Sequence, residues 1–213
     1  MRTAIEKRKT KETDIELEIN LDGRGKSDIV TGIGFFDHML TTLSSYSLID
    51  VRINAKGDRT GTHHTIEDVG IVLGSALAKA LGEKKGIKRA GCFTYIMDDV
   101  LAEAIIDLSG RGRLIFEDRN GNELKYSNEF LAGGSAERES SSFSFGFPSE
   151  EVKEFFWGIA TSMKANIAIR LIRTGNAHHE VEATFKAFAK ALRMACEIDE
   201  RNKDTIPSTK GVI

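Results

Sequence analysis

The chain of 213 residues is 40% hydrophobic and 29% charged, with a formal net charge of −2, which is ordinary for a soluble globular protein. The near-neutral charge and the lack of a basic stripe argue against nucleic-acid binding, and no run approaches the roughly 18 apolar residues that span a bilayer. The start at Met1-Arg2 lacks an apolar signal segment, and Cys92 and Cys196 are solitary. A disulfide is possible, but we expect a cytoplasmic protein without a membrane partner.

The first half of the chain predicts strands and helices in alternation. In order they are an alternating strand within residues 3–21, a short strand at Ser27–Val30 that returns antiparallel, a helix from about Thr31 to Tyr46, a strand at residues 48–56, and a helix capped by Thr62 and ended by Gly82.

The second half repeats this plan. It predicts a strand at Ala102–Leu108, a strand at residues 113–117, a helix from Ser149-Glu150-Glu151, a strand at Ile167–Ile172 and a helix opened by His178-His179. Residues 118–147 are polar and rich in glycine and serine, which predicts a loop or a poorly ordered insertion.

Two copies of the pattern HHxxE open the second helix of each half, at His63-His64-Thr65-Ile66-Glu67 and His178-His179-Glu180-Val181-Glu182. On a helix the first His and the Glu are four residues apart and share a face, and the second His and the Glu are three apart. Either pairing can converge on one ion, and imidazole with carboxylate suits a borderline divalent metal such as Mn, Fe, Co or Zn. Four of the five histidines lie in these two clusters, so we expect a dimetal site.

The spacing of further donors indicates an internal duplication. His38 precedes His63 by 25 residues, and Glu154 precedes His178 by 24, so Glu154 takes in the second half the place of His38 in the first. The alternative is two unrelated stretches that share HHxxE by chance. We divide the chain into a first half at 1–90, a second half at 91–195 and a C-terminal tail at 196–213.

The fold class that follows is α+β, with an internally duplicated unit of antiparallel sheet whose helices pack on one face. Half-exposed sheets of this kind make self-association plausible. If the ions need donors from both halves, the halves meet within one chain or neighbouring subunits bring them together; the sequence leaves both open.

Several separated motifs stand in a recognisable order. They are Phe36-Asp37-His38-Met39-Leu40, both HHxxE clusters, Asp107-Leu108-Ser109-Gly110-Arg111, Phe185-Lys186-Ala187 and Pro207-Ser208-Thr209-Lys210-Gly211. From about Lys9 to Ile213 the chain resembles the imidazoleglycerol-phosphate dehydratase family of histidine biosynthesis. The resemblance implies a duplicated βα fold like domain 2 of ribosomal protein S5. It also implies a hollow particle of 24 subunits with dimanganese sites between them, and a lyase that dehydrates D-erythro-imidazoleglycerol phosphate to imidazole acetol phosphate.

The resemblance also assigns residues. The implied ligands of two Mn²⁺ are His38, His63, His64, Glu67, His178, His179 and Glu182, with Glu154 as the eighth where several members carry His. The implied substrate-binding positions are Glu12, Arg89, Arg111, Lys186, Ser208, Thr209 and Lys210, most of them for the phosphate. Without the resemblance, the arginines read as surface residues and the tail as a frayed terminus.

The reaction explains why such residues are needed. The proton that is lost sits on a carbon with no adjacent carbonyl, so an electron acceptor is required, and an imidazole held between two divalent ions becomes one by losing its ring proton to give an imidazolate. The hypothesis that follows from the resemblance is that Glu12 takes the carbon proton. Its alternative is a solvated Glu at a strand edge beside Lys9 and Lys11.

Two other functions remain open to the residues alone. Paired ions can activate water for hydrolysis, although HHxxE is not the HExxH of zinc proteases. A non-enzymatic cage could use ions to template its assembly, in which case the metal site would be coordinatively closed rather than open.

Overall fold

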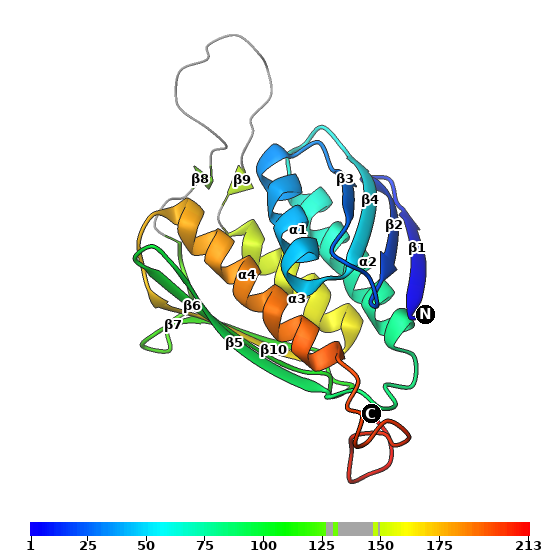
Figure 1. The fold of residues 1–213 in the computed structure, drawn as a ribbon. Helices are drawn as coiled ribbons and strands as arrows, with labels where there is room; N and C mark the ends of the chain where they lie inside the picture. The colour runs from blue at the N-terminus through cyan, green and yellow to red at the C-terminus, as the bar shows by residue number, and fades with distance from the viewer. Residues whose placement is uncertain (127–129, 132–146, 149) are drawn as a thin grey trace.

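Two four-stranded sheets enclose two layers of helices in the computed structural model (Figure 1), which describes residues 1–126, 130–131, 147–148 and 150–213. Helices α1 (Gly34–Ser47) and α2 (His63–Leu81) cover the inner face of the first sheet. Helices α3 (Glu151–Met163) and α4 (Ala177–Cys196) cover the second. The predicted α+β class with helices on one face of each sheet is therefore confirmed.

The first sheet has the strand order β1 (Thr3–Lys9), β2 (Thr13–Asn20), β4 (Asp50–Gly57) and β3 (Ser27–Val30). Ile15, Leu17 and Ile19 alternate along β2 and are buried against the helices, as the period of two predicts. The stretch predicted as one strand within residues 3–21 is a hairpin of two, because residues 10–12 turn the chain between β1 and β2.

Strand β3 runs antiparallel to β2, as predicted for residues 27–30, but it does not pair with β2, because β4 lies between them. Strand β3 pairs parallel with β4, with Ser27 opposite Val51. The reason is that α1 lies between the two strands in sequence, and a helical crossover brings the next strand back in the same direction. The sheets are thus mixed rather than wholly antiparallel.

The second sheet repeats the order of the first, which confirms the duplication. Its strands are β5 (Ala90–Met97), β6 (Val100–Asp107), β10 (Asn166–Arg173) and β7 (Arg113–Asp118), with β7 and β10 parallel across α3. Strand β5 is absent from the sequence prediction and stands where β1 stands in the first sheet. The predicted insertion at 118–147 includes residues 118–126, strand β8 (Phe130–Leu131) and the first residue of β9 (Phe147–Pro148), which pairs antiparallel with β8; the rest of it lies outside the described residues.

The helical layers meet across the middle of the molecule, where α1 packs on α4 and α2 on α3. Glycine is required at the second contact, because a Cβ at Gly70 would lie 2.4 Å from the carbonyl oxygen of Phe155 and one at Gly74 would lie 2.7 Å from that of Ile159. From the first contact to the second, the residue number rises by four on α2 and by four on α3, so the two helices run in the same direction. Among the described residues, no helix is long and apolar enough to cross a membrane.

Candidate metal centre

The second HHxxE cluster lies in the first turn of α4. The side-chain oxygen of Asn176 caps the helix by accepting the backbone N–H of His178 at 2.9 Å, which fixes where the helix begins. Glu182 follows one turn later, and its Oε2 lies 3.2 Å from His178 Nε2. The spacing of four residues therefore places both donors on one face, as predicted.

A third donor reaches this pair from the other half of the chain. His38 on α1 places its Nε2 3.7 Å from the same Oε2 of Glu182. The ligand atoms of His38, His178 and Glu182 all lie within 4.8 Å of one another, and no other group of three His, Cys, Asp or Glu in the described parts of the chain does so. The packing of α1 on α4 thus brings the halves together within one chain, which the sequence could not decide.

Lys186 holds the other oxygen of Glu182. Its Nζ lies 2.8 Å from Glu182 Oε1, both side chains are 12% exposed, and the ammonium stands 5.3 Å from the ring centres of Tyr46 and Tyr95. Burial is the largest single influence and would raise the pKa of Glu182, but the hydrogen bond and charge of Lys186, together with the charges of His38 and His178, outweigh it and the pKa is lowered. Glu182 therefore stays ionised, with one oxygen engaged by Lys186 and the other turned toward two imidazoles.

The first HHxxE cluster opens α2. His63 Nε2 lies 3.7 Å from Glu67 Oε2, again one turn apart. His64 lies between two acids: its Nδ1 is 3.0 Å from Asp58, and its Nε2 is 3.9 Å from the predicted base Glu12. The hydrogen bond that His64 donates to the Asp58 carboxylate raises the pKa of His64 above its usual 6.5. Thr62 precedes α2 as expected, but its hydroxyl donates to Glu151 at 2.7 Å instead of accepting from the helix.

The second histidine of each HHxxE cluster lies near an acidic residue in the turn of the first hairpin of its own half. In the second half, His179 Nδ1 lies 3.3 Å from Asp98 in the β5–β6 turn, the position that corresponds to Glu12 in the β1–β2 turn. Glu154 lies half-buried on α3, the helix that packs on α2. The structure does not gather Glu154 with His63 and Glu67 into a group as tight as that around Glu182.

The predicted phosphate-binding residues, Lys186 apart, gather at the opposite end of α4. The backbone N–H of Arg89 donates to the carbonyl of Ala195, and its guanidinium donates to Asp107 and, at 2.8 Å, to the carbonyl of Pro207. The tail with Ser208, Thr209 and Lys210 follows directly, and a Cβ at Gly110, beside Arg111, would lie 2.8 Å from the carbonyl carbon of Ile213.

This end lies far from the metal donors. Seventeen residues of α4 separate His178 from Ala195, which is about 26 Å at 1.5 Å per residue. Strand β1 gives a second estimate of this separation. Arg2, just before β1, donates to the carbonyl of Cys196 at the end of α4, and Glu12 follows the other end of β1, about 20 Å or more away. In Figure 1, α4 likewise runs from the end near β8 and β9 toward the C-terminus.

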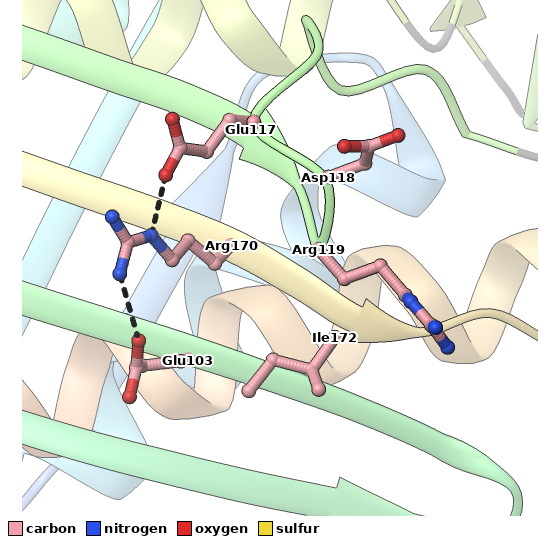
Figure 2. A pocket seen from close by; sticks show the side chains of 7 residues that line it. Glu103, Glu117, Asp118, Arg119, Arg170 and Ile172 are labelled. Carbon is pink, nitrogen blue, oxygen red and sulfur yellow. Dashed lines mark hydrogen bonds and ion pairs between the residues drawn. The ribbon is translucent and has the colours of Figure 1, made fainter.

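The donor set fits a divalent metal. Two imidazoles and a carboxylate are typical ligands of Mn, Fe, Co and Zn, and three protein donors leave coordination positions open. A separate pocket lies on the outer face of the second sheet, where Arg170 stands between Glu117 at 2.5 Å and Glu103 at 3.9 Å (Figure 2). Its lining carries three carboxylates and two guanidinium groups, and it contains none of the predicted site residues.

Known proteins match this chain in sequence over its full length. The sequence profile of the family described as imidazoleglycerol-phosphate dehydratase matches residues 31–192. The chain belongs to the imidazoleglycerol-phosphate dehydratase family. This confirms the resemblance of its motifs and its assignment as a dehydratase enzyme.

Similar proteins agree in sequence and in fold. Imidazoleglycerol-phosphate dehydratases from Thermoanaerobacter sp. (strain X514) and Hydrogenovibrio crunogenus are 47% and 45% identical, with 100% of both chains covered in each case. The crystal structure of the enzyme from Staphylococcus aureus is 34% identical, with a TM-score of 0.75 over 92% of this chain and 99% of that one. The enzyme from Pyrococcus furiosus is 36% identical, with a TM-score of 0.74 over 98% and 100%.

Some residues of the centre are missing from the sequence prediction. Asp58 and Asp98 carry no local signal, because each lies in a turn and meets its histidine only in the folded chain. The contact between Lys186 and Glu182 could have been found, since the two are four residues apart on a predicted helix.

Proposed function

We propose that this chain removes water from imidazoleglycerol phosphate to give imidazole acetol phosphate in histidine biosynthesis, with two Mn²⁺ in each active site. The observation that carries the proposal is the convergence of His38, His178 and Glu182, from both halves of a chain that belongs to the dehydratase family. The open coordination positions favour a catalytic site over a closed site that only templates assembly.

The residues that would hold the ions fall into two groups. His38, His178 and Glu182 would hold one ion, and His63, Glu67 and Glu154 would contribute to the other, with His64 and His179 as the remaining donors. Two bound cations would favour loss of the ring proton from the substrate imidazole and make the ring an acceptor of electrons. Lys186 would keep Glu182 Oε1 occupied, so that Oε2 faces the ion.

Glu12 is the proposed base. Its carboxylate is exposed and lies 3.9 Å from His64, a predicted ligand, so a substrate bound at the ions would bring its side chain to Glu12. The hydroxide expelled from the neighbouring carbon would take up the proton released by the imidazole ring and leave as water, and the C–H proton would pass to the Glu12 carboxylate, which returns it to the ring. The enol that results converts to the ketone.

The substrate's phosphate requires a second copy of the chain. A glycerol chain of three carbons reaches less than about 10 Å at roughly 1.5 Å per bond, so it cannot span the 20 Å or more between Glu12 and the Arg89 end of one molecule. We therefore propose that the chain self-associates, with the metal donors of one copy facing Arg89, Arg111 and the tail of another. The 24-subunit particle that the resemblance implies would satisfy this requirement.

The test is turnover by the purified, manganese-loaded protein. Incubation with imidazoleglycerol phosphate should produce the enolisable ketone, and the Glu12→Gln variant should bind metal and substrate normally but show almost no turnover. A wild-type protein without ketone formation would refute the reaction. Retained turnover in Glu12→Gln would refute the role of Glu12 alone.

A further inference from the structure

The hairpin that carries Glu12 is tied to α2 by one buried carboxylate. Asp68 follows the predicted ligand Glu67 on α2, and its side chain is only 9% exposed. Its Oδ1 accepts from Arg8 Nε on β1 at 2.9 Å, and its Oδ2 accepts from Thr13 Oγ1 on β2 at 2.5 Å. One acid thus contacts both strands of the hairpin, on either side of its turn.

Hydrogen bonds within the turn connect the Asp68 contact to Glu12. Thr10 Oγ1 lies 3.2 Å from Thr13 Oγ1 and accepts the backbone N–H groups of both Glu12 and Thr13 at 3.0 Å. The backbone N–H of Thr10 donates to the carbonyl of Thr13 at 2.9 Å, which closes the turn. The path from Asp68 through Thr13 and Thr10 to the backbone of Glu12 is therefore continuous.

We propose that Asp68 is a positioning residue that sets where the Glu12 carboxylate stands relative to the metal donors of α2. The proposal rests on the proposed function, in which Glu12 takes the carbon proton. Because Asp68 shares one helix with His64 and Glu67, a shift of the metal donors carries the hairpin with it. The distance between the base and the metal donors would then be held by the hydrogen bonds of the buried Asp68 carboxylate, although the Glu12 side chain itself is exposed.

A positioned base requires this kind of support. A short surface turn fluctuates readily, and a displacement of about 1 Å in a reacting group can lower the rate roughly 100-fold. The ion pair between Lys9 and Asp14, at 2.6 Å, also joins the two strands, but its side chains are 78% and 55% exposed. It therefore provides a matched control in the same hairpin.

The test compares Thr13→Val with Thr13→Ser and Asp14→Asn in the manganese-loaded protein. Thr13→Val removes the hydroxyl at nearly constant shape, so kcat should fall about 10- to 100-fold. KM and manganese affinity should stay within about twofold, because no predicted ligand is removed. Hydrogen–deuterium exchange at residues 10–13 should become at least about tenfold faster. Thr13→Ser should restore both kcat and protection, and Asp14→Asn should resemble wild type in both. Asp68→Asn should act in the direction of Thr13→Val.

Several results would overturn the proposal. Unchanged exchange in Thr13→Val would mean that the bond to Asp68 does not hold the turn, and faster exchange with unchanged kcat would mean that the turn does not position a base. Loss of manganese together with activity would assign Asp68 a merely structural role. Turnover that survives Glu12→Gln would refute the role of Glu12 as the base, and with it this proposal, but not the proposed reaction. An inactive wild type would refute the proposed function itself, and the exchange experiment would still report on the anchor.

Discussion

Two inactive variants should restore activity to each other if the active site draws on two copies of the chain. Glu12→Gln removes the proposed base at one end of the molecule, and Arg111→Ala removes a predicted phosphate contact at the other. Arg111 is exposed, and Glu12 is exposed at its turn, so neither change should perturb the fold. Each variant alone should have very low kcat/KM for imidazoleglycerol phosphate.

The magnitude follows from the separation of the two ends. About 26 Å along α4 and 20 Å or more along β1 exceed what the substrate can span, so Glu12 and Arg111 of one copy cannot serve the same molecule. In randomly mixed assemblies of equal amounts, a site that takes one residue from each of two copies has both intact in about a quarter of cases. The mixture should therefore show about 25% of wild-type kcat/KM.

The assay is coexpression of the two variants with different affinity tags, followed by purification on both tags in sequence. Native mass spectrometry measures the ratio of the two chains in the assemblies, and the variants expressed separately and mixed after purification serve as the control for subunit exchange. Activity no higher than that of the single variants, in assemblies that contain both chains, would refute the shared site.

Two further predictions concern the helix contact and metal binding. Gly70→Ala should lower the free energy of unfolding by about 1–2 kcal/mol, because the overpacking against the Phe155 carbonyl at 2.4 Å exceeds the gain in helix propensity. Urea unfolding measures this change, and the control Ser75→Ala on the same helix should be close to neutral. An unchanged unfolding midpoint in Gly70→Ala would contradict the packing. Manganese loading should fall on acidification because imidazoles must be neutral to bind, and Asp58 makes His64 easier to protonate by raising its pKa above 6.5. Asp58→Asn should lower that pKa and move the loading curve, measured by equilibrium dialysis, to lower pH; full loading of the wild type at about pH 5 would contradict the involvement of histidine.

Much of the architecture was predictable because it is periodic or repeated. The period of two in β2 gave its buried face, and the spacings from His38 to His63 and from Glu154 to His178 gave the duplication. The strand with which β3 pairs was not predictable from its own four residues, which fit a parallel or an antiparallel neighbour equally well. The helix that follows held the missing information, because a crossover of that length favours parallel pairing. Strand β5 was missed because its exposed outer face carries apolar residues such as Ile96, which blurs the alternation.

For the candidate centre, the sequence predicted which donors are one helical turn apart but not how the helices that carry them meet. Helical spacing correctly placed His178 with Glu182 and His63 with Glu67. The contact of His38 with the second cluster depends on α1 packing against α4, and no local pattern reveals which helix of the other half a given helix will meet. The same holds for Asp68 and Thr13, which are 55 residues apart and meet only because α2 lies on the first sheet.

The exchange of donors between the halves explains why the duplicated units act as one. Each half has its own sheet and two helices, but α1 packs on α4 and α2 on α3, so each first helix meets the second helix of the other half. His38 therefore lies near Glu182 of the second HHxxE cluster and not near the Glu of its own half. For Glu182, His38 of the first half is the nearest imidazole on another helix. Separating the halves would disrupt the donor group around Glu182 as well as the helical core. The proposed sharing of sites between subunits would extend the same arrangement, in which no repeating unit, half or whole, holds a complete set of residues.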